Sequence, residues 1–330
     1  MKTNAVSEDI AQVRLPTLSH IRGQPQVTNA LELHLQGHFA MQSICGTSST
    51  AAGPFLLAGP SGTGKTMVAK VIHSELRNRA LIETNGQVLN SRQELFLTLI
   101  HADANTTIFI DEAQAMGHQV QHILLTALSE GVLRVPARAG STYSHTVQLA
   151  PFTMILATTH EYLLQDALRN RMRACCRFDY YSVADLVEIV RQYAEALKWG
   201  YQCDTVLEAI AQRAKGTPRL ALHRNLRTCW YATVKRGSTT ITLEDARTAF
   251  RCLQIDALGL DQLDRSYLEV LLKHGPTAAG VLAARLLLPT QTLQRVVEPY
   301  LLRTELITKD RSSRRAITEQ GRCHIESNSP

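Results

Sequence analysis

The eight residues GPSGTGKT at positions 59–66 constrain most strongly what this chain can fold into. They follow the short apolar run PFLLA at 54–58 and precede a segment with helical periodicity, which predicts a helix over 65–77. A glycine-rich turn between a strand and a helix presents backbone N–H groups at the helix N-terminus, where they cradle phosphates. The sequence therefore predicts an α/β domain whose parallel sheet carries a nucleotide site.

Two side chains of this loop supply the chemistry that a nucleoside triphosphate requires. Lys65 is placed to reach the β and γ phosphates, and the hydroxyl of Thr66 is placed to ligate Mg²⁺. We therefore predict ATP and Mg²⁺ as cofactors, and the alternative is a glycine-rich turn that binds no ligand. The loop residues expected to bind ATP are Gly59, Pro60, Gly62, Thr63, Gly64, Lys65 and Thr66.

A second apolar run, TIFIDEAQ at 107–114, ends in two adjacent carboxylates. Parallel strands deliver their carboxyl ends to one edge of a sheet, so we expect this pair beside the phosphate loop. Asp111 is predicted to hold the Mg²⁺, and Glu112 is predicted to polarise the water that attacks the γ-phosphate. Taken singly, either residue is also what an ordinary helix start carries.

Strand-like and helical patterns alternate from about residue 27 to 181, which predicts a parallel sheet flanked by helices. The expected elements are PFLLAG at 54–59, a helix over 65–77, ALIETN at 80–85, a helix over 91–101, TIFIDE at 107–112, a helix over 117–130 and FTMILATT at 152–159. Between residues 132 and 149, β-branched residues flank an Ala-Gly-Ser turn, which predicts an inserted hairpin.

Beyond residue 181 the periodicity becomes helical. We predict a flexible N-terminal tail over 1–15, a large α/β domain over 16–181, a small helical domain over 182–255 and a winged-helix domain over 256–330. Ser182 and Thr242 are placed to cap helices of the small domain, and Gly216 and Gly237 are placed to stop them. In the last domain three helical segments precede two short strand patterns that bracket a basic turn.

The composition limits where the chain can work. Hydrophobic residues make up 45% and charged residues 19% of the 330 positions, and no apolar run approaches the roughly 18 residues that a membrane helix needs. The N-terminus MKTNAVSEDIAQVRL is polar where a signal peptide would be apolar, so we expect a cytoplasmic protein. The seven cysteines form no C-x-x-C pair and are expected to be reduced thiols.

The net charge of +6 is mild, but basic residues cluster in the turn of the last domain. This turn has only Asp310 as an acidic neighbour. A local excess of positive charge predicts contacts with DNA phosphates that give affinity without reading sequence. The alternative is a solvated basic turn. The predicted DNA-binding residues are Lys309, Arg311, Arg314 and Arg315.

Six motifs in one order, followed by the winged-helix pattern, resemble the AAA+ ATPases: RGQPQV, GPSGTGKT, FIDEAQ, ILATTH, LRNRM and GTPRLAL. Within that superfamily, PFTMILATT, FDYYSVADLVEIV, GTPR, GLDQLDRSYLEVL and EPYLL resemble the RuvB family of Holliday-junction branch-migration motors. The resemblance runs from about residue 14 to 322. It implies an AAA+ ATPase domain, a helical lid and a winged helix, assembled as a homo-hexameric ring that moves the duplex arms of Holliday junctions in DNA recombination and repair.

The resemblance also implies roles outside the phosphate loop. Thr159 matches sensor 1, whose hydroxyl orders the water near the γ-phosphate, and Arg219 matches sensor 2, which reaches from the lid to the nucleotide. The alternatives are a plain strand end and a solvated arginine. The positions that pack around the adenine match Ile21, Arg22, Gly23, Tyr181 and Pro218, although such residues are more often ordinary core.

The segment ALRNRM at 167–172 holds two arginines, and no acidic residue at helical spacing is placed to neutralise both. In the family that the chain resembles, the second arginine of L-R-x-R is the arginine finger, which acts on the site of the neighbouring subunit. That position is Arg171 here, with Arg169 as the alternative finger. Surface ion pairs are the plainer interpretation of both residues.

The inserted hairpin at 132–149 matches the segment that docks onto a RuvA-type junction-binding adaptor, and a RuvC-type resolvase is a further possible partner. Small interfaces depend on apolar anchors, and this hairpin offers Val135, Tyr143 and Val147. Its apolar surface is thinner than is usual in the family. We nevertheless expect a RuvA-type adaptor to bind here.

Two departures from the family pattern stand out. The acidic pair is followed by Ala113 and Gln114 where Ile-His is usual, and the basic turn KDRSSRR lacks the usual glycine. Two other functions stay open. One is an AAA+ replication initiator or loader that switches on nucleotide, and the other is a divergent RuvB-like ATPase of a mobile element with a different adaptor.

Overall fold

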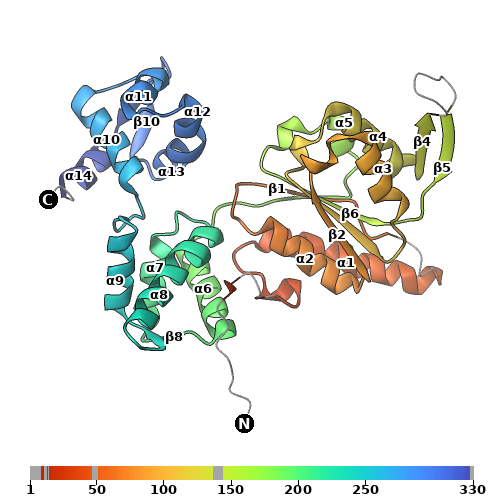
Figure 1. Cartoon of the computed structure of the whole chain (residues 1–330), viewed down its shortest axis with the longest axis horizontal. Helices are drawn as coiled ribbons and strands as arrows, with labels where there is room; N and C mark the ends of the chain where they lie inside the picture. The colour runs from red at the N-terminus through yellow and green to blue at the C-terminus, as the bar shows by residue number, and fades with distance from the viewer. Residues whose placement is uncertain (1–8, 11–12, 14, 47–50, 137–143, 328–330) are drawn as a thin grey trace, which may run out of the picture. The chain divides into compact units, whose positions relative to one another are not determined.

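The computed structural model describes residues 9–10, 13, 15–46, 51–136 and 144–327. They form two compact units, drawn in Figure 1. The first unit joins the chain up to Leu197 to the short segment Gly216–Arg219, and the second joins Lys198–Lys215 to the chain from Leu220 onward. The boundaries predicted at residues 182 and 256 separate domains, not these two compact units. They stay predictions.

The first unit is built on a five-stranded parallel sheet with strand order β2-β3-β6-β1-β7. The strands are β1 Phe55–Ala58, β2 Ala80–Asn85, β3 Thr106–Asp111, β6 Thr153–Thr158 and β7 Ala174–Arg177. Every residue of β1 and β6 is buried, as expected for central strands of a sheet covered on both faces. The predicted parallel sheet is confirmed. Its edge strand β7 was not predicted, because only alternate residues of this four-residue strand are buried.

Helices cover both faces of this sheet (Figure 1). One apolar core includes residues of α1 and α2, and the other includes residues of α3 and α4. The helices of the first unit are α1 Pro25–Cys45, α2 Lys65–Leu76, α3 Arg92–Ile100, α4 His118–Glu130, α5 Asp166–Arg169 and α6 Val183–Leu197. Ser182 caps α6 as predicted, because its hydroxyl accepts a hydrogen bond from the backbone N–H of Asp185 at 3.1 Å.

The inserted hairpin is present as predicted. Strands β4 Val132–Pro136 and β5 Ser144–Gln148 pair antiparallel, with Val132 opposite Gln148, and they project from the sheet domain in Figure 1. The hairpin begins directly after Gly131, which ends α4 in the left-handed region at φ 68°. The turn between the strands, with Tyr143, lies outside the described residues.

The second unit begins with a small helical bundle. Its elements are β8 Gly200–Tyr201, α7 Asp204–Gln212, the π-helix η6 Leu220–Leu226, α8 Arg227–Lys235, β9 Thr240–Ile241 and α9 Leu243–Cys252. Thr242 caps α9 as predicted, in a capping box with Asp245. The two tryptophans of the chain, Trp199 and Trp230, stack here with ring centroids 4.8 Å apart.

The rest of the second unit is a winged helix. Its elements are α10 Gln262–His274, α11 Ala279–Leu286, α12 Thr290–Thr292, the π-helix η7 Leu293–Val297, α13 Glu298–Arg303, β10 Ile307–Lys309, β11 Arg315–Ile317 and α14 Glu319–Ser327. The third predicted helix is divided by η7, which ends just before Pro299. Helix α14 was not predicted. In the described part of the chain, no helix is both long enough and apolar enough to span a membrane.

Candidate nucleotide site

The phosphate loop follows β1 and runs into the first turn of α2, as the sequence predicts. Gly59 and Gly62 have φ of 146° and 81°, a region that other residues rarely adopt. A Cβ at Gly59 would lie 2.5 Å from the carbonyl oxygen of Phe178, and one at Gly62 would lie 2.9 Å from Cβ of Arg219. The loop therefore needs glycine at both positions for its conformation and for close packing.

Lys65 lies inside this loop with a buried side chain. Its ammonium group donates hydrogen bonds to the carbonyl oxygens of Gly59 and Pro60, both at 2.8 Å. Burial lowers the pKa of Lys65 to about 8, against the opposing effect of the carboxylates of Glu112 and Asp111. The ammonium is held by two neutral carbonyl oxygens, and a phosphate can take their place.

Thr66 and Asp111 meet where α2 begins and β3 ends. The hydroxyl of Thr66 donates to Oδ2 of Asp111 at 3.3 Å, and Oδ1 of Asp111 accepts from the backbone N–H of Glu112 at 2.9 Å. A carboxylate and a hydroxyl are hard oxygen ligands, and Mg²⁺ usually takes one or two such protein ligands together with phosphates and water. The pair fits that donor set.

Glu112 lies beside the end of β6, with its backbone in the left-handed region at φ 47°. Its Oε2 accepts a hydrogen bond from the hydroxyl of Thr159 at 3.1 Å and a second from the side-chain amide of Gln114. The structure therefore brings the expected base and the expected sensor 1 together. Gln114 was not predicted as a site residue, and its only signal in the sequence was its departure from the usual Ile-His.

Tyr181 and Arg219 both contact the phosphate loop. The hydroxyl of Tyr181 donates to the carbonyl oxygen of Thr63 at 2.8 Å, and Arg219 donates to the hydroxyl of Ser61 at 2.9 Å. The backbone N–H of Arg219 also donates to Gly62, at 3.2 Å. The expected sensor 2 arginine is therefore already in reach of the loop.

The other residues expected around the adenine differ in how exposed they are. Pro218 is buried and Ile21 is half-buried, whereas Arg22 is exposed and donates to the carbonyl oxygen of Ser19 at 3.1 Å. Gly23 packs closely on Tyr181, since a Cβ there would lie 2.5 Å from the tyrosine ring. The adenine contacts of these residues stay predictions.

Arg169, the last residue of α5, and Arg171 just beyond it have different surroundings. Arg169 pairs with Asp166, and its guanidinium lies 3.7 Å from Glu161. Arg171 instead donates to backbone carbonyls at the end of α4, to Leu128 at 3.1 Å and Ser129 at 3.4 Å. Within the described ranges Arg171 has no carboxylate partner, so it is the arginine whose charge is left for another group.

The basic turn requires one correction to the predicted DNA-binding set. Arg315 is buried, and its Nε and Nη2 lie 2.9 and 3.0 Å from the carboxylate oxygens of Glu298. A guanidinium held inside the domain by a buried carboxylate is not available to a phosphate. The prediction for Arg315 is therefore wrong, because a pattern of like charges in sequence does not show a partner 17 residues away.

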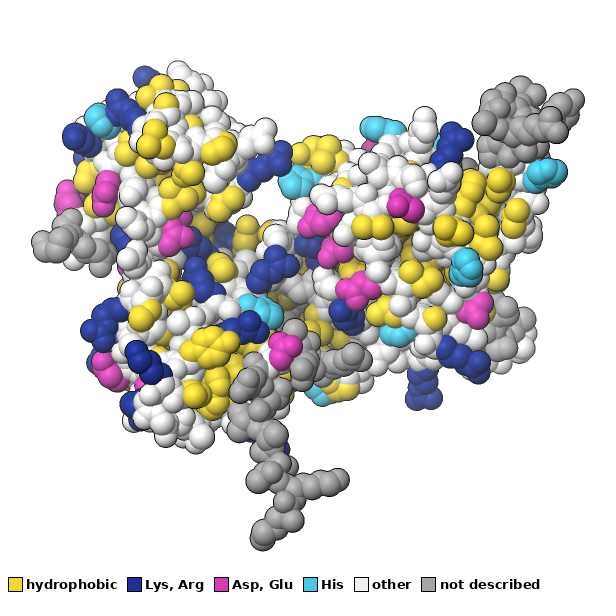
Figure 2. Space-filling view, in the orientation of Figure 1, with side chains coloured by type: hydrophobic (Ala, Val, Ile, Leu, Met, Phe, Trp, Pro, Cys, Tyr) yellow, Lys and Arg dark blue, Asp and Glu magenta, His cyan; other side chains and the backbone are white. Residues whose placement is uncertain are grey.

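The other three basic residues are exposed. Lys309 lies 3.3 Å from Glu298, and Arg314 pairs with Asp310 at 2.9 Å. Arg311 has no ion-pair partner among the residues that the structure describes. On the face drawn in Figure 2, Lys and Arg side chains are spread over both units and do not form one large patch.

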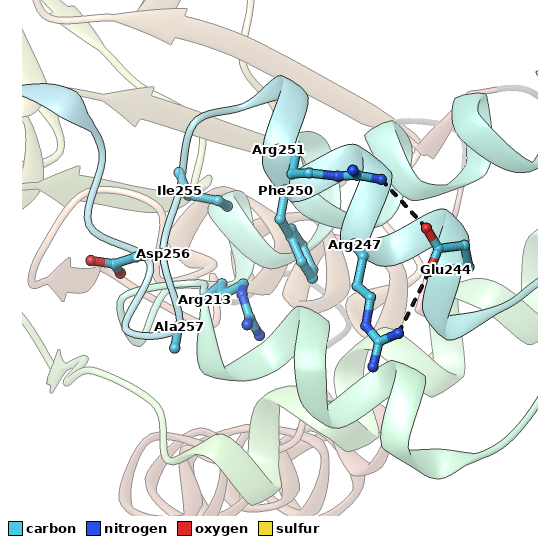
Figure 3. A pocket seen from close by; sticks show the side chains of 8 residues that line it. All are labelled: Arg213, Glu244, Arg247, Phe250, Arg251, Ile255, Asp256 and Ala257. Atoms are coloured by element: carbon cyan, nitrogen blue, oxygen red, sulfur yellow. Dashed lines mark hydrogen bonds and ion pairs between the residues drawn. The ribbon is translucent and has the colours of Figure 1, made fainter. Parts of the chain in front are cut away.

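A pocket of about 470 Å³ in the second unit lies outside the nucleotide site (Figure 3). Its lining includes Arg213, whose guanidinium lies over the ring of Phe250 at 4.5 Å. Glu244 pairs with Arg247 at 3.5 Å and with Arg251 at 3.4 Å. Because one carboxylate already serves two of the three arginines, we assign no ligand to this pocket.

Comparison with known proteins gives the family. Residues 13–178 match the Holliday junction DNA helicase RuvB P-loop domain, residues 181–256 match the RuvB AAA lid domain, and residues 257–326 match the RuvB C-terminal winged helix domain. The Holliday junction branch migration complex subunit RuvB of Fervidobacterium nodosum is 36% identical over 258 residues, which span 77% of this chain and 74% of that protein. The chain belongs to the RuvB family.

Solved RuvB structures agree with this assignment. The Holliday junction branch migration motor RuvB of Thermotoga maritima superposes with a TM-score of 0.78 at 29% identity, over 96% of this chain and 99% of that one. A single-substitution mutant of the same protein superposes with a TM-score of 0.79 at 29% identity, over 96% and 100%. The predicted combination of a P-loop α/β domain, an AAA lid and a winged helix is confirmed.

Proposed function

We propose that this RuvB family member is an ATP-driven DNA motor that promotes branch migration of Holliday junctions in recombination and repair. The observation that carries the proposal is the convergence of Lys65, the Thr66–Asp111 pair and the Glu112–Thr159 pair at one edge of a parallel sheet. This arrangement occurs in a chain that matches all three RuvB domains. The replication initiator or loader has no such support from the comparisons.

The chemistry proposed at this edge is hydrolysis of the γ-phosphate of ATP. Glu112 accepts a proton from the attacking water while the water oxygen bonds to the γ-phosphorus. The bond from the γ-phosphorus to the β–γ bridging oxygen breaks, and ADP leaves with that electron pair. Lys65 balances charge on the β and γ phosphates, and Thr159 orders the water. Thr66 and Asp111 would hold Mg²⁺, which neutralises charge on the phosphate oxygens when it is bound.

A complete site is proposed to need a second copy of the chain. Arg171 would reach the γ-phosphate of a neighbouring subunit, and its release from the carbonyls of α4 leaves no buried charge behind. Arg219 would contact the nucleotide bound in its own subunit, since it already contacts Ser61. A homo-hexameric ring places one finger at each interface, and closed rings are how head-to-tail contacts are usually satisfied.

DNA is proposed to contact Lys309, Arg311 and Arg314 on the exposed side of the wing. The contacts would be to phosphates, because a motor that moves along duplex arms needs affinity that does not depend on sequence. The β4–β5 hairpin is proposed to bind a RuvA-type adaptor. Val132, Val135 and Val147 are its partly buried apolar residues in the described strands.

The proposal is tested by dissociation of a synthetic four-way junction, which separates a motor from a nucleotide-controlled loader. A motor resolves the junction into duplexes only while ATP is hydrolysed. A loader binds DNA and hydrolyses ATP without moving the branch point. Glu112→Gln serves as the matched control, since it is expected to bind ATP and fail to cleave it.

A further inference from the structure

Gln114, in the short helix η4 Ala113–Ala115, lies at the centre of a hydrogen-bond network that joins the ends of β3 and β6. Its amide nitrogen donates to Oε2 of Glu112 and to the hydroxyl of Thr159, the latter at 3.1 Å. Its amide oxygen accepts from the hydroxyl of Thr158 at 2.5 Å. Both ends of the amide are therefore engaged, one with the proposed base and the other with the strand that carries sensor 1.

The orientation of this amide follows from the donors and acceptors around it. The buried hydroxyl of Thr158 accepts a hydrogen bond from the backbone N–H of His160 at 3.0 Å and donates its single proton to the oxygen of Gln114. The carboxylate of Glu112 can only accept, so it must face the NH₂ group. With the amide flipped, its oxygen would face the carboxylate oxygen of Glu112, and that contact would be repulsive.

The network leaves one oxygen of the base unoccupied. Oε2 of Glu112 accepts from Gln114 and from Thr159. Among the residues that the structure describes, Oε1 accepts no hydrogen bond. A carboxylate held by one oxygen presents the other in a fixed direction, which is the requirement for a base that must meet a water molecule within hydrogen-bond distance. The backbone of Glu112 lies in the left-handed region, and its side chain contacts Thr159 directly after β6.

We propose that Gln114 is the positioning residue of this ATPase site, which fixes Glu112 against the sensor 1 strand and leaves Oε1 free for the attacking water. This rests on the proposed role of Glu112 as the base. In this role Gln114 acts through Glu112 and not on the water or the phosphate. Gln114 bonds to Glu112, Thr158 and Thr159 at once, so it links the base to sensor 1 and to the strand before it.

The first test is a kinetic cycle on the full chain with duplex DNA and Mg²⁺. Gln114→Ala should lower kcat for ATP by about 10- to 100-fold, because a misplaced catalytic group costs about that much, and should leave ATP affinity within about twofold. In single-turnover reactions, Gln114→Ala added to Glu112→Gln should cause no further loss, because its effect passes through Glu112. Gln114→Met serves the same cycle at nearly constant side-chain size if the alanine variant is poorly folded.

The second test uses pH and a side chain of the same length. Gln114→Glu places a second carboxylate beside Glu112, which makes Glu112 harder to ionise. The acidic limb of the kcat–pH profile should move upward by about one pH unit or more, whereas Gln114→Ala should not move it. The matched control is Gln121→Ala, which removes a buried glutamine that bonds instead to Met116 and Gln165. It should lower the melting temperature without changing the profile.

The outcomes separate this inference from the function on which it rests. If Glu112→Gln hydrolyses ATP at the wild-type rate, the base itself is misassigned. If Glu112→Gln is inactive while Gln114→Ala matches wild type, only the positioning role is overturned. Independent, multiplicative losses in the double variant, or an unmoved acidic limb in Gln114→Glu, would likewise reduce Gln114 to a structural residue.

Discussion

Arg315 of strand β11 and Glu298 of helix α13 form a two-point ion pair inside the winged helix, at 2.9 and 3.0 Å. Both side chains are almost fully buried, and the hydroxyl of Tyr267 donates to the same carboxylate at 3.2 Å. The pair raises the pKa of Arg315, chiefly through its hydrogen bond to Glu298. It ties the wing to the helices, so the exposed arginines beside it are presented on a fixed hairpin.

Because of this pair, a single substitution should strongly lower the free energy of unfolding. Glu298→Ala leaves the guanidinium of Arg315 buried without its carboxylate partner, and breaking a buried pair costs about 3–5 kcal/mol. We expect that loss in the free energy of unfolding, measured by urea denaturation and circular dichroism. Glu326→Ala, on the exposed side of α14, should stay within about 0.5 kcal/mol of wild type. Equal stability of Glu298→Ala and Glu326→Ala would contradict the account.

DNA binding should depend on the exposed arginines of the wing. Charge reversal at Arg311 and Arg314 should weaken duplex affinity and lower the slope of log affinity against log salt by about two, since each lost phosphate contact removes about 0.9. Basal ATPase without DNA should not change. Reversal at Arg247 and Arg251, exposed arginines of the same unit, is the matched control. A wild-type slope in the wing variant would place the DNA contact elsewhere.

The low pKa of Lys65 predicts a proton linked to ATP binding. With its pKa at about 8, Lys65 is charged at pH 7 and mostly neutral at pH 9. Phosphates favour the charged form, so binding should take up close to one proton at pH 9, and affinity should fall as pH rises above about 8. Calorimetry in two buffers of different ionisation enthalpy measures this uptake. Lys70→Ala should retain the uptake and Lys65→Arg should abolish it; uptake by Lys65→Arg would point to another group.

The arginine finger predicts activity that requires two chains. Arg171→Ala alone should lose about 10³-fold or more in ATP turnover, and so should Glu112→Gln alone. A mixture should regain some turnover at interfaces that join an intact finger to an intact base. Arg169→Ala, which removes an arginine paired with Asp166, should retain most activity. An inactive Arg169→Ala beside an active Arg171→Ala would reverse the assignment.

The parts of the fold and site that the sequence predicts are those carried by neighbouring residues. GPSGTGKT, FIDEAQ and the hairpin pattern each fix a local geometry, and the parallel sheet then brings Lys65, Asp111 and Glu112 together. Contacts made by distant side chains were not predictable in this way. In the sequence Arg315 has the same pattern as its basic neighbours, and only the fold places Glu298 beside it. The π-helices η6 and η7 have the apolar spacing of ordinary helices, so periodicity did not reveal them.

Branch migration of a synthetic four-way junction is the direct test of the proposed motor activity. The rate of dissociation of a labelled junction into duplexes is measured with ATP, with a non-hydrolysable analogue, and with or without a RuvA-type adaptor. The account predicts dissociation that requires ATP hydrolysis, is faster with the adaptor and is absent in Glu112→Gln. Steady ATP hydrolysis with no junction dissociation under any of these conditions would contradict it and favour a nucleotide-controlled loader.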